Sequence, residues 1–334
     1  MTKPLRGVNL GGWLVLEPWL TPSLFAGTGA VDEYTYCQHA SATTGLKNLQ
    51  QHRDAFVSEH DFAWLAEQGM DAVRLPVGYW LFGDIDPYVE TASYVDLAFS
   101  WAETYNITIL LDLHGAPGSQ NGTMHSGRMG DSGWAKQENI AQTLSVLGRI
   151  ADRYGKHKSL LGISLLNEPS PAIASETLED FYAEAYVMLR ERCHSAAWIV
   201  FSDAFKPRQW RKRLPAEHYA DMYVDHHQYQ IFAWLDKLLP ARVQVWRAKF
   251  LLPRKLQAMA KRHPLIVGEW SLAMRSEKLR HVHSEKRRRL AKVYYQDQVA
   301  AFDCTAAWFY WTYKTENGGL WSFRDMVDSK IITR

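Results

Sequence analysis

The sequence predicts an α/β protein that folds as a (β/α)₈ barrel. Three observations favour this class: a length of 334 residues, eight short β-rich segments in succession, and helical patterns between them. Parallel strands need a long crossover, usually a helix, so this alternation is typical of a closed parallel barrel. Such barrels reach this size as one unit when loops are inserted. We therefore expect residues 1–334 to form a single domain.

Each predicted strand is a short run of β-branched, aromatic or other apolar residues. In chain order the strands are Gly7–Trp13, Ala72–Val77, Ile107–His114, Gly162–Glu168, Trp198–Asp203, Tyr223–Tyr229, Leu265–Trp270 and Ala306–Tyr313. No internal repeat or low-complexity linker interrupts this order.

Helix signals fall between the strands. Ser58 and Asp61 have the spacing of a capping box, Phe62 and Leu65 form an apolar stripe behind them, and Gly69 is a natural stop. A helix is therefore predicted over 58–68. The same spacing predicts two more helix starts, at Ser93 with Asp96 and at Thr177 with Asp180.

Three connections after predicted strands are long: Val15–Gln50, Gly115–Gly133 and Gln230–Phe250. The connections that follow barrel strands lie on the catalytic face. Long loops rich in Gly, Pro and aromatic residues are expected there to build the walls of a substrate site.

The composition is that of an ordinary folded enzyme, with 47% hydrophobic and 22% charged residues. The formal charge is only +2, so we interpret the basic clusters Lys206–Arg213 and Arg275–Lys292 as solvated surface and expect no nucleic-acid and no membrane partner. The 14 tryptophans fit an enzyme that docks sugar rings on indoles.

The three cysteines, Cys37, Cys193 and Cys304, cannot all pair with one another and lack the spacing of a metal or redox motif. Residues 1–6 lead into a strand without an apolar signal region. We therefore expect a reducing, cytoplasmic setting. The oligomeric state cannot be predicted.

Barrel enzymes carry their reactive groups at the carboxyl ends of the strands, so polar residues there are the candidate site. The candidates lie in or at the ends of the second, third, fourth, sixth, seventh and eighth predicted strands: Arg74, His114, Asn167, Glu168, His227, Tyr229, Glu269 and Trp311.

Two of these residues, Glu168 and Glu269, end nearly opposite strands. A lone glutamate at a strand tip could serve a structural ion pair, but two facing glutamates suit glycoside hydrolysis by an acid/base and a nucleophile. Arg74 and Tyr229 would hold Glu269 ionised, and burial would keep Glu168 protonated. A separation of about 5–5.5 Å would make the reaction retaining.

Seven segments spread over nearly the whole chain resemble glycoside hydrolase family 5, and within it the branch of exo-β-1,3-glucanases. They are Arg6–Trp19 (RGVNLGGWLVLEPW), Val73–Gly78 (VRLPVG), Leu113–Gly122 (LHGAPGSQNG), Leu166–Pro169 (LNEP), Asp225–Gln230 (DHHQYQ), Val267–Trp270 (VGEW) and Trp308–Glu316 (WFYWTYKTE). The resemblance implies a TIM barrel that hydrolyses terminal β-glucosidic bonds with retention.

The resemblance also implies residue roles. Asn167 would bond the sugar 2-hydroxyl, His227 would lie near the acid/base, Tyr229 would contact the nucleophile, and Trp311 would form the platform of the −1 subsite. Glu17 would bind hydroxyls at the pocket floor.

In the outer part of the site, this sequence matches the family pattern at two aromatic positions and departs from it at one. Trp321 matches a further pocket tryptophan, and Phe232 retains one half of an aromatic clamp at the +1 entrance. Thr123 stands where the branch usually carries the other phenylalanine. This departure, together with the missing secretion signal, leaves open which linkage is preferred and whether the substrate is a polymer.

Three alternatives remain open. The first is a β-glucosidase for short β-1,6-linked or aglycone-bearing glucosides, and the second is a non-catalytic carbohydrate-binding barrel. The third is a metal hydrolase, suggested by the adjacent Asp225, His226 and His227 and by the close pair His281 and His283. Neighbouring strand residues point to opposite faces, so His226 and His227 would not share a site. We expect no cofactor and no required metal.

Overall fold

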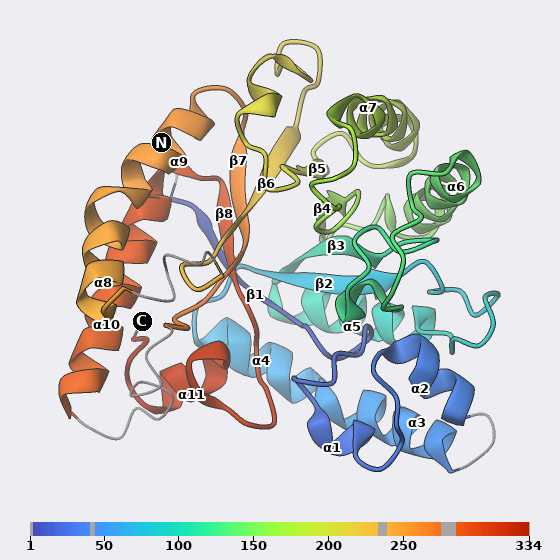
Figure 1. The fold of residues 1–334 in the computed structure, drawn as a ribbon, viewed down its shortest axis with the longest axis horizontal. Helices are drawn as coiled ribbons and strands as arrows, with labels where there is room; N and C mark the ends of the chain where they lie inside the picture. Colours follow the sequence, from blue (N-terminus) through green and yellow to red (C-terminus); the bar gives the residue numbers. More distant parts are fainter. Residues whose placement is uncertain (1–2, 41–43, 233–238, 275–284, 334) are drawn as a thin grey trace.

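The computed structural model describes residues 3–40, 44–232, 239–274 and 285–333. Its centre is a closed barrel in which each strand pairs in parallel with the next and the eighth pairs with the first (Figure 1). The strands are β1 (Leu5–Asn9), β2 (Ala72–Gly78), β3 (Thr108–Gly115), β4 (Leu160–Ser164), β5 (Trp198–Ser202), β6 (Met222–Gln228), β7 (Leu265–Trp270) and β8 (Ala307–Tyr310). The predicted (β/α)₈ TIM barrel and all eight strands are thus confirmed.

Helices surround the barrel (Figure 1). The α-helices are α1 (Pro22–Phe25), α2 (Glu33–Ala40), α3 (Gly45–Phe56), α4 (Glu59–Glu67), α5 (Ala92–Tyr105), α6 (Gln137–Tyr154), α7 (Ser175–Arg192), α8 (Ala241–Phe250), α9 (Leu252–Ala260), α10 (Glu285–Ala301) and α11 (Phe323–Asp328). Short 3₁₀ turns include η1 (Met124–Ser126), η2 (Gln209–Lys212), η4 (Phe302–Cys304) and η5 (Gly319–Trp321). Within the described ranges, none of the helices combines the length and the apolar character that crossing a bilayer requires.

The capping box predicted at Ser58 and Asp61 is present at the start of α4, and Gly69 follows the helix with a φ of +70°. The other two predicted starts are wrong. Helix α5 begins after Thr91, because the Ser93 amide and hydroxyl bond the Glu90 carboxylate instead of a capping partner further along. Helix α7 begins at Ser175, two residues before the predicted Thr177.

Two of the predicted long loops contain helices. The first holds α1, α2 and part of α3, and the stretch predicted as Gln230–Phe250 ends in the ten residues of α8. The loop after β3 contains only η1.

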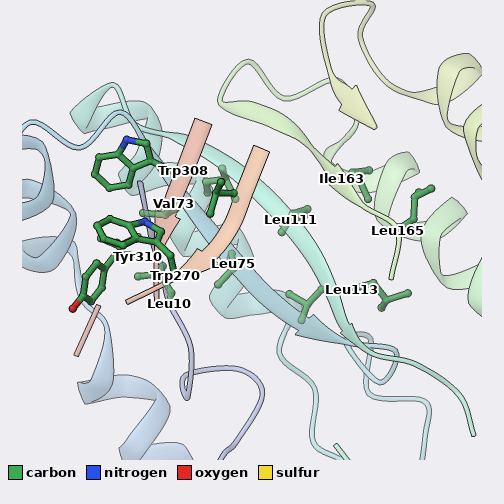
Figure 2. Packing of buried hydrophobic residues seen from close by; sticks show 14 of the residues in the cluster. Leu10, Val73, Leu75, Leu111, Leu113, Ile163, Leu165, Trp270, Trp308 and Tyr310 are labelled. Atoms are coloured by element: carbon green, nitrogen blue, oxygen red, sulfur yellow. The ribbon is translucent and has the colours of Figure 1, made fainter. Parts of the chain in front are cut away.

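Apolar side chains form two cores on the two sides of the barrel wall. A large core fills the space between strands and helices, and Figure 2 shows part of it, with Val73, Leu75, Leu111, Ile163 and Trp270 on strands of the barrel. A smaller core lies inside the barrel, made by residues of the opposite face: Ala72, Leu110, Leu161, Val200, Ile266, Ala307 and Phe309. This alternation follows the two-residue period of a strand.

Two positions further along the strands, the barrel interior becomes polar. On β2 the inward-facing residue after Ala72 is Arg74, and on β3 the one after Leu110 is Asp112. All four side chains are buried. The apolar core therefore seals the amino-terminal end of the barrel, and the charged side chains project toward the carboxyl-terminal end of its strands.

Candidate active site

The candidate site is a cavity of about 580 Å³ at the carboxyl ends of the strands. Nine of the predicted site residues line it: Glu17, His114, Asn167, Glu168, Tyr229, Phe232, Glu269, Trp311 and Trp321. The other two, Arg74 and His227, are buried and hydrogen bonded to lining residues. The structure therefore brings together all eleven residues selected from the sequence.

Strand pairing and direct hydrogen bonds fix the position of Glu269. It lies beside His227 in the pairing of β6 with β7. Arg74 Nη1 donates to Glu269 Oε1 at 3.1 Å, and the Tyr229 hydroxyl donates to Oε2 at 2.8 Å. Burial raises the pKa of Glu269, and the charges of His227 and Arg74 oppose that rise.

The residue before Glu269 must be glycine. A Cβ on Gly268 would lie 2.2 Å from the Asp225 carboxylate, which accepts a hydrogen bond from the Gly268 amide at 2.7 Å. This close approach lets the carboxylate of Asp225 sit directly behind the site.

Glu168 lies four residues beyond the end of β4 at Ser164, not at the tip of the strand as predicted. Backbone hydrogen bonds to both flanking strands continue past Ser164, since Leu165 donates to Val200 on β5 and Asn167 donates to Leu113 on β3. Glu168 itself has a left-handed backbone, with φ +41°, a conformation that costs energy and occurs often at functional sites.

His227 controls the charge of Glu168. Its Nδ1 is 2.7 Å from Glu168 Oε1 and 3.5 Å from Glu269 Oε2, and its Nε2 is 3.3 Å from Asp225 Oδ2. Although burial disfavours a charged imidazole, the surrounding carboxylates raise the pKa of His227. This environment favours the protonated ring in the free protein.

The expectation that burial keeps Glu168 protonated is wrong for the free protein. Burial does act to raise the pKa of Glu168, but the hydrogen bond and charge of His227, with smaller contributions from His125 and His114, hold that pKa at about 2. The carboxylates of Glu168, Glu269 and Asp225 around the ring favour the imidazolium form of His227.

A second network orients the floor of the cavity. Arg74 Nη2 donates to Asn167 Oδ1 at 2.8 Å, and Asn167 Nδ2 is 3.4 Å from His114 Nε2. The other nitrogen of His114 is 2.7 Å from Asp112 Oδ2. The His114 ring lies nearly parallel to the Trp311 indole, with centroids 5.4 Å apart. The side chains of Asn167 and Trp311 are thus fixed before any ligand enters.

Aromatic residues surround Glu17 in the lining of the cavity. Trp19 Nε1 donates to Glu17 Oε2 at 2.7 Å, and the Trp19 and Trp321 rings meet edge to face at 5.3 Å. Trp321 also contacts Tyr229. Burial raises the pKa of Glu17 to about 7, and the charge of His114 and the Trp19 hydrogen bond only partly oppose it.

The raised pKa of Glu17 predicts how the stability of the folded protein changes with pH. The folded chain favours the protonated acid, so the ionised form costs stability as pH rises above 4.5, and the full cost is present above about 7. Glu17→Gln keeps an acceptor for Trp19 and removes the ionisation. It should stabilise the protein by about 3 kcal/mol at pH 9 and by little at pH 4. Urea denaturation at the two pH values measures the difference, and an equal effect at both would contradict it.

Four lining residues were missed by the sequence analysis: Trp19, Met124, His125 and Phe205. Trp19 lies within a segment that resembles the family, so it could have been selected there. Phe205 could not, because it reaches the cavity through two successive left-handed residues, Ala204 and Phe205, after β5.

The two adjacent histidines of the metal alternative, His226 and His227, do not share a site. His226 Nδ1 is 2.6 Å from Asp203 Oδ2, whereas His227 contacts Glu168 and Asp225, so the adjacent histidines face different partners. In the described part of the chain, a group with ligand spacing is Glu168, His227 and Glu269, whose nearest suitable atoms lie within 4.8 Å of one another. His281 and His283 lie outside the described residues.

Comparison with known proteins identifies the class. The family profile "Cellulase (glycosyl hydrolase family 5)" matches residues 37–317. A probable glucan 1,3-beta-glucosidase A of Emericella nidulans is 33% identical over 377 residues, covering 99% of this chain and 90% of the relative. A sporulation-specific glucan 1,3-beta-glucosidase of Saccharomyces cerevisiae is 32% identical, covering 99% and 86%.

Among solved structures, a rutinosidase from Aspergillus niger matches with a TM-score of 0.81 at 20% identity, covering 99% of this chain and 98% of that one. Together the barrel, its paired glutamates and these relatives define a glycoside hydrolase. The chain belongs to glycosyl hydrolase family 5, which confirms the family predicted from the sequence motifs.

Proposed function

We propose that this protein is a retaining exo-β-glucosidase that hydrolyses terminal β-D-glucosidic bonds, with Glu269 as nucleophile and Glu168 as acid/base. The main support for this proposal is the proximity of the two carboxylates, because a carboxylate oxygen of Glu168 lies within 4.8 Å of a carboxylate oxygen of Glu269. Retaining enzymes need carboxyl groups about 5–5.5 Å apart, whereas inverting enzymes leave roughly 6.5–9.5 Å for a water.

The reaction proceeds in two displacements. In the first, the Glu269 carboxylate attacks C1, the bond from C1 to the leaving oxygen breaks, and Glu168 gives its proton to that oxygen. In the second, water attacks C1, the Glu168 carboxylate takes the water proton, and the bond from C1 to Glu269 breaks.

The first step needs protonated Glu168, and His227 is the nearest source. Transfer of the proton from Nδ1 to Oε1 across 2.7 Å leaves a neutral imidazole and a carboxylic acid. Substrate favours this transfer because it displaces water, which disfavours the charged pair, and because it places a hydrogen-bond acceptor, the glycosidic oxygen, against Glu168.

The remaining residues bind the terminal sugar. Asn167 and His114 present polar nitrogens beside the carboxylates, Glu17 presents a carboxyl beside Trp19, and Trp311 offers an indole face to the ring. Arg74 and Tyr229 orient Glu269. The described chain works as one catalytic domain in this proposal.

Product stereochemistry tests the mechanism. Early-time proton NMR of an aryl β-glucoside digest should show β-glucose as the first sugar released, before mutarotation. An α-configured first product would overturn the double displacement.

The substrate we propose is a β-gluco-oligosaccharide cut from its non-reducing end. Trp19, Glu17 and Trp321 lie together in the lining of the cavity, which supports release of single glucose units. The names of the curated relatives favour β-1,3 linkages. The runner-up is a short β-1,6-linked or aglycone-bearing glucoside, favoured by the small Thr123 beside the outer apolar side chains Phe205 and Phe232.

Thr123→Phe separates the two substrates. The Thr123 hydroxyl donates to the Asn121 side chain, and Thr123 lines the cavity that also contains Phe232, so a ring here can add stacking on a second sugar. The gain should be about 1–2 kcal/mol, or roughly 5–30-fold in kcat/KM for laminaribiose and laminarin, with an aryl β-glucoside unaffected.

Thr123→Val is the matched control, since it removes the hydroxyl without adding a ring. An equal gain in both variants would contradict the stacking argument. An early laminarin digest dominated by long oligosaccharides would contradict exo-action.

A further inference from the structure

Both oxygens of the Glu168 carboxylate have a histidine beside them. His227 Nδ1 contacts Oε1 at 2.7 Å, and His125 Nε2 lies 3.5 Å from Oε2. His227 belongs to one of the segments that resemble the family. His125 lies in the η1 turn after β3, outside those segments.

The turn that carries His125 is tied to Glu168 itself. Asn121 Nδ2 donates to the Glu168 backbone oxygen at 2.9 Å, and the Asn121 side-chain oxygen accepts from the Thr123 amide at 3.0 Å. Ser126, which follows His125, shares a hydrogen bond of 2.6 Å with Ser119. The distance between His125 and the carboxylate is therefore set by the fold.

The environment of His125 keeps its ring neutral. Four titratable groups face it: Glu168, Asp112, His114 and His227. Burial, helped by the positive potential of the two histidines, outweighs the carboxylates and lowers the pKa of His125 to about 4. The ring of His114 meets that of His125 edge to face at 5.5 Å.

The two nitrogens of this neutral ring have different surroundings. Nδ1 is buried and has no hydrogen-bond partner in the described structure, so an N–H there would lack an acceptor. Nε2 faces the Glu168 carboxylate. The tautomer with hydrogen on Nε2 is therefore favoured, and it places a donor nitrogen 3.5 Å from an oxygen of an anion.

We propose that His125 is a positioning residue that donates from Nε2 toward Glu168 Oε2 and so holds the acid/base in its ionised form. This inference rests on the proposed function. The ionised form is the one that must accept a proton from water in the second displacement, and donors to a carboxylate favour that form. His125 then assists the second step and limits the pH range in which Glu168 can serve as an acid in the first.

The test compares His125→Ala with His125→Gln, because a glutamine amide can place a donor near the position of Nε2. In His125→Ala the pKa of the Glu168 carboxyl, followed by carbon-13 NMR in the Glu269→Gln background, should rise by about 0.5–1 unit. The kcat for an aryl glucoside with a very good leaving group should fall, since the second displacement limits it. His125→Gln should restore the pKa that Glu168 has when His125 is present.

Met124→Ala is the matched control for trimming the same turn, and it should leave the pKa of Glu168 in place whatever it does to KM. An unchanged Glu168 pKa in His125→Ala, or an equal shift in His125→Gln, would overturn the inference. The titration needs no turnover. A failure of the proposed glucosidase reaction would therefore be distinguishable from a failure of this inference.

Discussion

Glu269→Gln should lower kcat for any β-glucoside by a factor on the order of 10⁴–10⁶, because an amide cannot form the glycosyl ester on which both displacements depend. The substitution keeps the shape of the side chain, and a hydrogen bond with Tyr229 remains possible. Initial rates on an aryl β-glucoside measure the loss. Circular dichroism and Tm check that the fold is retained.

Glu168→Ala should behave differently and serves as the paired variant. It loses acid catalysis but keeps the nucleophile, so substrates whose leaving groups need no protonation should still form the intermediate. Azide should then restore turnover and give a β-glycosyl azide. Azide rescue of Glu269→Gln with that same product would show that the two roles had been exchanged.

Arg74→Met should cost about 3–5 kcal/mol of unfolding free energy as well as activity, because it leaves several buried acceptors without their cation. Arg74 Nη2 lies 2.9 Å from Asp112 Oδ1 and 3.8 Å from Asp225 Oδ2, and Nη1 lies 3.1 Å from Glu269. Urea denaturation at pH 7 measures the change.

The pH dependence of this loss has a definite sign. Burial alone would raise the pKa of Asp112, but Arg74 and the His114 hydrogen bond lower it below the usual 3.8, so its contribution is present above that pH and lost as pH falls. The deficit of Arg74→Met should therefore shrink in acid. Arg74→Lys, which keeps a cation, should lose less; an equal loss would contradict the charge argument.

The barrel and the site residues could be predicted because each left a local signal. Parallel strands buried on both faces appear as continuous apolar runs, and the polar residues at their ends stand out against those runs. The predicted range Gly162–Glu168 shows the limit of this reasoning. The strand ends at Ser164 although Leu165 and Asn167 still donate backbone hydrogen bonds to the flanking strands, and no local sequence pattern marks that end.

Charge states were harder to predict than positions. The pKa of Glu168 depends on His227, 59 residues away, and the state of His227 depends in turn on Asp225 and Glu269. Contacts of this kind are tertiary, so reasoning from burial alone gave the wrong sign for Glu168. Phe205 and His125 were missed for a related reason, since loop backbone geometry brings them to the cavity.

The closure of the barrel at β1 and β8 also bears on protein synthesis. Asn9 on the first strand accepts from Arg74 at 2.9 Å and donates toward the backbone oxygens of Gly268, Phe309 and Tyr310, up to 301 residues later in the chain. A nascent chain on the ribosome can place Arg74 beside Asn9 early, but the Asn9 amide has no native acceptor until β7 and β8 have been translated. The arrangement of Asn9, Arg74 and Glu269 is therefore completed only near the end of translation, and catalytic competence should appear as a late, single event.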